Sequence, residues 1–64
     1  MLIKRKSIYS GTISEMDIDV TPAQIDAWHW QGELIQNAMP NLSAQEREFM
    51  MSGITPTEWN EMFN

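Results

Sequence analysis

Few side chains in this 64-residue sequence have the types and spacing that chemistry requires. Asp17 and Asp19 lie two residues apart in an alternating segment, so on a strand both carboxylates would point to one face. Such a pair can hold a divalent cation when other oxygen ligands converge. Ca²⁺ takes about six or more oxygens, and no loop of the sequence supplies them. We therefore expect cross-strand pairing or solvation of these carboxylates, and no metal site.

His29 is the single histidine, and it follows Asp26 by three residues, a spacing that permits contact on a helix. A catalytic histidine also needs a nucleophile, and most Ser and Thr residues here have capping or turn positions. The chain has no Cys, and one His alone does not make a zinc site. With no Gly-rich phosphate loop, we expect no enzyme, no cofactor, and a surface or half-buried His29.

Two tryptophans flank His29 and are more informative. Trp28 and Trp30 lie about 200° apart on a helix, so they cannot both face one core. Trp28 shares its side with Ile25 and is the better core candidate. For Trp30 two interpretations stay open. We favour burial, because a small domain uses its large apolar side chains, whereas exposure is typical of a binding hot spot.

Methionine is abundant, with six in the chain. Met fills core gaps, which is the interpretation we favour, and it also builds adaptable binding surfaces. Met50 and Met51 lie about 100° apart on a helix, so Met51 lies nearer the edge if Phe49 and Met50 face inward. The candidates for a partner-facing patch are therefore Trp30 and Met51, together with His29 beside Trp30.

The charge distribution bears on the choice of partner. The net charge is −5, and three of the four basic residues are Lys4, Arg5 and Lys6. From residue 7 onward, Arg47 stands against nine acids. Phosphate backbones repel such a surface, so we expect no nucleic-acid binding, and acidity favours solubility and a basic protein partner. No apolar run approaches the about 20 residues of a membrane span, and no signal peptide is evident, so we expect a cytoplasmic protein.

The first twenty residues predict a β-hairpin. Residues 15–20 alternate polar and apolar residues, residues 2–9 form the candidate partner strand, and Ser10-Gly11 is a turn signal. A longer loop around Gly11 would shift the register that a two-residue turn sets. The cross-strand pairs expected for the two-residue turn are Lys4–Asp17, Lys6–Glu15 and Ile3–Ile18.

Helix start signals dominate the remainder of the sequence. Three capping boxes combine Thr or Ser with Gln or Glu three residues later, at Thr21–Gln24, Ser43–Glu46 and Thr55–Glu58. Gly32 and Gly53 are typical of residues that follow a helix end. The helices predicted from these signals and from the apolar periodicity span residues 22–31, 33–39, 44–52 and 56–63.

Together these elements predict a single α+β domain over residues 1–64. A hairpin at 1–20 packs on three to four short helices at 22–63, since helices this short are marginal alone. A chain of this length buries only roughly 60% of its unfolded surface, so a homodimer stays open. The predicted core is Ile3, Met16, Ile18, Val20, Ile25, Trp28, Leu34, Ile35, Ala38, Met39, Leu42, Phe49, Met50, Ile54, Trp59, Met62 and Phe63.

Five short segments within roughly residues 16–63 form a distinctive pattern, namely Gly32–Gln36, Met39–Ser43, Glu46–Phe49, Gly53–Pro56 and Glu58–Trp59. In these segments the sequence resembles a set of very small uncharacterised bacteriophage proteins. The resemblance implies a viral accessory protein made in a bacterial cytoplasm, and it brings no activity or functional residue with it.

Protein binding is the function that we expect, in a small acidic phage-type accessory protein that modulates a host or viral factor. One alternative is a homo-oligomeric structural or assembly protein. A further alternative is sequestration of a small molecule by Trp28, Met39 and Phe49. Ligand sites usually measure at least about 300 Å³, so that alternative needs an oligomer interface to complete its pocket.

Overall fold

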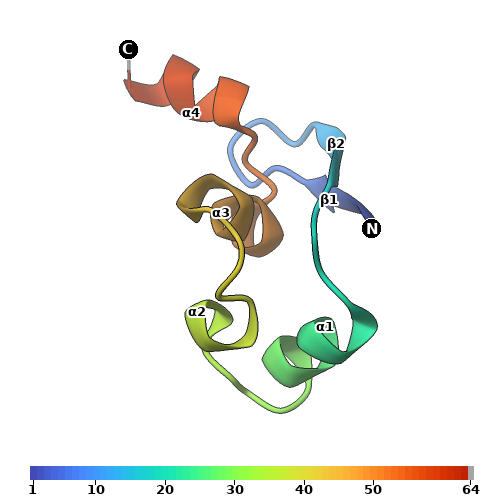
Figure 1. Cartoon of the computed structure of the whole chain (residues 1–64). Helices are drawn as coiled ribbons and strands as arrows, with labels where there is room; N and C mark the ends of the chain where they lie inside the picture. The colour runs from blue at the N-terminus through green and yellow to red at the C-terminus, as the bar shows by residue number, and fades with distance from the viewer. Residues whose placement is uncertain (64) are drawn as a thin grey trace.

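The computed structural model describes residues 1–63, and within them it has the predicted α+β fold. The elements are β1 (Leu2–Lys6), β2 (Ile13–Asp17), α1 (Pro22–His29), α2 (Ile35–Ala38), α3 (Ala44–Ser52) and α4 (Pro56–Phe63). The molecule is elongated, with extents of 34 × 19 × 18 Å. Figure 1 shows α1 and α2 at one end, α4 at the other, and α3 between them, with the hairpin alongside.

The hairpin register differs from the predicted one. Antiparallel pairing joins Leu2 to Asp17, Ile3 to Met16, Lys4 to Glu15, Arg5 to Ser14 and Lys6 to Ile13. The expected pairs Lys4–Asp17, Lys6–Glu15 and Ile3–Ile18 are therefore wrong. The shift is by two residues, which leaves every side chain on its expected face. Charge matching across the strands survives, because Lys4 Nζ lies 3.5 Å from Glu15 Oε1.

The buried residue Ser7 organises a hairpin loop that is longer than the predicted turn. Its N–H donates to the Thr12 carbonyl at 2.9 Å, and its carbonyl accepts from Gly11 N at 2.9 Å. Its hydroxyl accepts from the N–H groups of Tyr9 and Ser10 at 3.1 and 3.2 Å. These bonds satisfy a buried polar residue and the loop backbone, which a tight turn at Ser10-Gly11 would not do.

All three predicted capping boxes are confirmed. The N-cap hydroxyls of Thr21, Ser43 and Thr55 each accept from the N–H three residues later at 3.2 Å. In return, the side-chain Oε1 atoms of Gln24, Glu46 and Glu58 accept from the N–H groups of the N-cap residues at 3.0, 2.9 and 3.2 Å. The side-chain bonds satisfy helix-end N–H groups that have no partner inside the helix.

The bounds of α1 and α2 differ from the predicted residues 22–31 and 33–39. Helix α1 stops at His29, with Trp30 as its C-cap. Helix α2 is a single turn that begins at Ile35, because Glu33 N donates to the Ala27 carbonyl at 3.0 Å and so belongs to the end of α1. Gly32, at φ 73°, allows the chain to reverse between the two helices.

The core lies where the end of the hairpin meets α2 and α3. Its buried apolar residues are Ile18, Val20, Met39, Leu42, Phe49, Met50 and Ile54. Half-buried residues packed against it are Ile3, Met16, Ile25, Trp28, Ile35 and Ala38. The expected burial of Leu34, Met62 and Phe63 is wrong, since all three are exposed. Met39 and Phe49, which were considered with Trp28 for small-molecule sequestration, are fully buried in this core.

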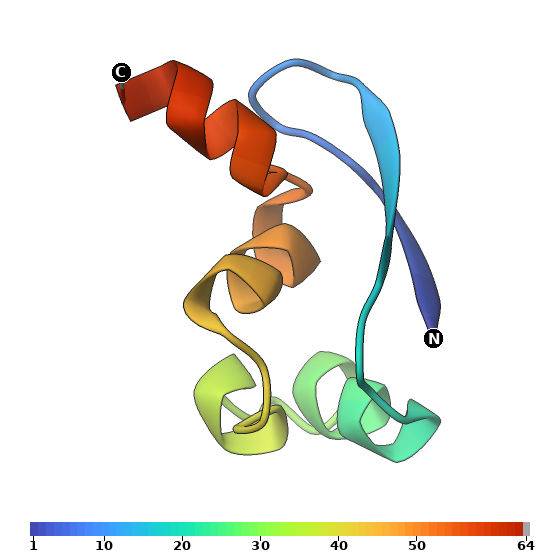
Figure 2. The same ribbon diagram turned by 45° about the horizontal axis from the view of Figure 1, so that its top comes forward.

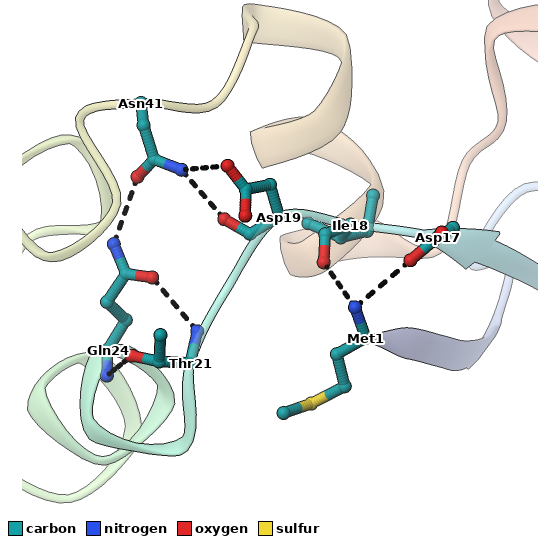
Figure 3. Close-up of polar contacts among 7 residues, drawn as sticks. All are labelled: Met1, Asp17, Ile18, Asp19, Thr21, Gln24 and Asn41. Atoms are coloured by element: carbon teal, nitrogen blue, oxygen red, sulfur yellow. Dashed lines mark hydrogen bonds and ion pairs between the residues drawn. The ribbon is translucent and has the colours of Figure 1, made fainter.

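Polar contacts tie the N-terminus and the loop before α3 to the hairpin (Figure 3). The Met1 amino group donates to Asp17 Oδ1 at 3.0 Å and to the Ile18 carbonyl at 2.9 Å. Asn41 Nδ2 donates to the Asp19 carbonyl at 2.7 Å, and Asn41 Oδ1 accepts from Gln24 Nε2 at 2.9 Å. These contacts hold the segment that joins β2 to α1.

Neither a bilayer-spanning helix nor a metal-binding cluster is found in residues 1–63. No helix there is both long and apolar enough to cross a membrane. No three or more Asp, Glu or His side chains gather there as metal ligands would.

Candidate functional site

A groove of about 490 Å³ lies between the last two helices. We call it the α3–α4 groove. Its lining residues are Ala44, Gln45 and Glu48 from α3, and Trp59, Asn60 and Phe63 from α4. Each helix contributes positions i, i+1 and i+4, which lie on one helix face. Figure 2 shows that α3 and α4 diverge from their short connection. The groove that their side chains line is open to solvent.

An aromatic pair forms the α4 wall of the groove. The rings of Trp59 and Phe63 stack at a centroid distance of 4.9 Å and an interplanar angle of 24°. Their i, i+4 spacing puts the two side chains beside each other on the helix. Trp59 is half-buried, whereas Phe63 is 73% exposed. The pair therefore leaves a large apolar area in water, and covering such area is favourable by roughly 25 cal/mol per Å².

Acidic side chains dominate the charge around the groove. Glu48 is half-buried in the lining, and α4 also carries Glu58 and Glu61. The one base on these helices, Arg47, is half-buried, and its Nη2 lies 3.5 Å from the Pro40 carbonyl. The groove is thus suited to a cationic group rather than to an anion.

The hairpin holds α4 away from the core at the connection after α3. Gly53 has φ 76°, and a Cβ there would lie 2.9 Å from Ser7 N and clash with the Lys6 carbonyl. Ile8 N donates to the Ser52 carbonyl at 3.0 Å, which fastens the hairpin loop to the end of α3. The end of β1 occupies the space next to Gly53. Ile54 therefore lies in the core, whereas α4, which follows it, points away from the core.

The hairpin loop also contacts α4 directly. The Ser10 hydroxyl donates a hydrogen bond to Glu58 Oε2, while Glu58 Oε1 accepts from Thr55 N at 3.2 Å. The bond from Ser10 is the main reason why the pKa of Glu58 is lowered, and the Thr55 N–H adds to the effect. The orientation of α4, and with it the groove, therefore depends on a contact between distant parts of the chain.

Of the side chains proposed from the sequence, Trp30 lies outside the groove. It is 78% exposed, so the favoured burial is wrong. The reason is that α1 ends before Trp30 and turns Ile25 and Trp28 toward the core. The exposed His29 ring meets Trp30 edge to face at a centroid distance of 4.8 Å. Both belong to the end of α1, and α1 and α4 lie at opposite ends of the molecule (Figure 1).

Met51 is the sequence-proposed residue that lies beside the groove. It is 46% exposed, so the core-filling role favoured for it is wrong. It follows Glu48 by three residues on α3, and this spacing makes the two side chains neighbours on the helix surface. Met51 therefore extends the α3 wall with a flexible apolar side chain.

Trp59 and Phe63 were expected in the core, so the groove that they line was not predicted from the sequence. Their i, i+4 spacing is the same in a helix that packs on a core and in one that stands free, so periodicity cannot separate the two cases. The groove depends on the direction that the chain takes after Gly53. No local sequence pattern predicts that direction.

Comparisons of the chain with protein-family models, with curated proteins and with solved structures found no match.

Proposed function

We propose that this chain is a non-enzymatic protein-binding module whose contact surface is the α3–α4 groove. The observation that carries the proposal is the stacked Trp59–Phe63 pair, largely uncovered beside a groove of about 490 Å³. Aromatic side chains are enriched at protein interfaces and dominate binding hot spots, because they bury much area with few rotatable bonds. A partner that covers Phe63 and Trp59 removes this apolar area from water, which favours binding.

Charge supports a protein partner with a basic surface. The net charge of −5 and the glutamates of α3 and α4 attract basic proteins and repel nucleic-acid backbones. Charge complementarity of this kind speeds association and selects among partners. With the resemblance to small bacteriophage proteins, it supports an accessory role in a bacterial cytoplasm, in which the chain modulates a host or viral factor.

Capture from bacterial lysate with matched variants tests the proposal. Immobilised wild type, Phe63→Ala and Trp30→Ala are compared at low salt. Both substitutions remove an exposed aromatic ring, but only Phe63 lines the groove. We expect proteins that wild type and Trp30→Ala retain and that Phe63→Ala loses. A retained set that is empty, or unchanged by Phe63→Ala, contradicts the proposal.

A second candidate is a homodimer formed through the hairpin. Leu2 and Ile13 are exposed and belong to the same face of the two strands, and within residues 1–63 the outer edge of β2 has no strand partner. Such an edge can pair with a second chain. Sedimentation at micromolar concentration, with Ile13→Lys as the variant, separates the candidates. A dimer that Ile13→Lys dissociates supports self-association, and a wild-type monomer removes it.

A further inference from the structure

We propose that the α3–α4 groove binds an arginine-bearing segment of its partner. This inference rests on the proposed function and names the side chain that the groove selects. The groove combines an aromatic wall, a carboxylate and two side-chain amides, namely Trp59 and Phe63, Glu48, and Gln45 and Asn60. Arginine is the side chain whose chemistry meets all three.

The aromatic wall provides the first contact. The Trp59 and Phe63 rings stack 24° from parallel, so each ring covers one face of the other and leaves its outer face as the surface on which a ligand can stack. A planar guanidinium stacks on such a surface through dispersion and cation–π attraction, and Trp is the strongest aromatic partner for a cation. Because Phe63 is 73% exposed, this contact needs no rearrangement of the domain.

Glu48 provides the charge. Glu48 is a half-buried residue of the α3 wall, so it brings a carboxylate to the groove beside the aromatic pair. A guanidinium donates two parallel N–H groups to a carboxylate in a charge-assisted pair. The amide oxygens of Gln45 and Asn60 can accept from the remaining N–H groups. A lysine ammonium offers neither the planar face nor the paired donors, and it is more strongly hydrated.

The size of the groove favours a segment of polypeptide over a single ion. A volume of about 490 Å³ lies within the range of roughly 300–1,000 Å³ for ligand sites. Ala44 leaves room on one wall, and Met51 next to Glu48 adds an adaptable apolar surface. Apolar residues that flank the arginine would cover Met51 and the outer face of Phe63.

The three tryptophans allow each surface to be observed separately. We would record the indole N–H signals of Trp28, Trp30 and Trp59 by NMR while adding a short peptide with one arginine between two leucines. Matched peptides carry citrulline or lysine in place of the arginine. We expect the Trp59 signal to move with the arginine peptide while Trp30 stays in place. Affinity should fall about tenfold with citrulline, which keeps the shape but loses the charge, and less with lysine.

Two glutamate variants test the carboxylate. Glu48→Gln removes the charge in the groove, and we expect about tenfold weaker binding of the arginine peptide. Glu33→Gln is the matched control, because it changes the net charge equally at an exposed position between α1 and α2. It should leave the affinity unchanged. Equal losses in both variants would overturn the assignment of Glu48, since they would report net charge alone.

The outcomes separate this inference from the proposed function. Equal binding of the three peptides at Trp59 overturns the choice of arginine and leaves the groove as a protein-binding surface. Binding that moves Trp30 and not Trp59, or no binding by any peptide, overturns the inference, while lysate capture still decides the proposed function. Arg5 is an exposed arginine of β1 that could enter the groove of a second copy. If the Trp59 signal moves as the protein concentration rises without any peptide, and Arg5→Gln abolishes this movement, the groove binds a second copy and the inference of a segment from another protein is overturned.

Discussion

Ser10 in the hairpin loop donates a hydrogen bond to Glu58 in α4, although 48 positions separate them in the chain. Glu58 also closes the capping box of α4 through Thr55. One carboxylate thus joins the start of α4 to the hairpin. Because α4 supplies one wall of the α3–α4 groove, this contact links the hairpin to the candidate binding surface.

The Ser10–Glu58 contact should make stability depend on pH. The fold lowers the pKa of Glu58 below its usual 4.5, mainly through the Ser10 hydroxyl, so the folded state favours the carboxylate. This contribution is fully present above pH 4.5 and is lost as pH falls through the lowered pKa. In urea unfolding from pH 6 to pH 3, we expect the stability difference between wild type and Ser10→Ala to shrink below pH 4.5. Thr57→Ala serves as control for an exposed hydroxyl in α4, and a constant Ser10→Ala difference would contradict the prediction.

Two glycine variants should separate backbone strain from a steric clash. Gly53 and Gly32 have nearly equal φ values of 76° and 73°, so alanine costs each about 1–2 kcal/mol in backbone strain. At Gly53 the added Cβ also meets the Lys6 carbonyl, whereas at Gly32 nothing lies within 4 Å. Overpacking adds about 1–3 kcal/mol, so Gly53→Ala should be the less stable variant in chemical denaturation. Equal losses of stability in the two variants would contradict close contact between β1 and the connection from α3 to α4.

Asn41 offers a test of the contacts drawn in Figure 3. Its amide bridges the Asp19 carbonyl and Gln24, so Asn41→Ala should cost about 1 kcal/mol. In a domain of this size that loss lowers the melting temperature by about 4–8 °C. Asn41→Asp should cost more, because it removes the donor and adds a negative charge beside Asp19. Added salt should narrow the gap between the two variants, since these positions are exposed.

Substitution by alanine should reduce stability strongly at Phe49 and very little at Phe63. Phe49 is fully buried, and Phe→Ala in a core costs about 3–5 kcal/mol, a large part of the stability of a small domain. Phe63 is 73% exposed, and its removal should change stability by less than about 0.5 kcal/mol. Near-ultraviolet circular dichroism and thermal melting distinguish the two results. A loss for Phe63→Ala as large as that for Phe49→Ala would contradict the exposed position of Phe63.

Local interactions explain which features could be predicted. Capping boxes join residues three apart, so Thr21, Ser43 and Thr55 marked the helix starts in the sequence. The hairpin register was wrong by two residues because it depends on Ser7, which the tertiary structure buries. The facing of the strands was right, since a shift by two preserves the alternation.

The sequence by itself determined the order of elements, the starts of the three capped helices and the acidic character, because capping, alternation and charge belong to neighbouring residues or to composition. Only the tertiary structure decided which apolar stripes are covered. Phe63 has the spacing of a core residue, and Trp30 is a large apolar residue for which burial was favoured, but the end of α1 and the close contact of Gly53 with β1 leave both rings exposed. The apolar pattern of a helix indicates which face is hydrophobic. Whether another part of the chain packs against that face depends on the path of the whole backbone.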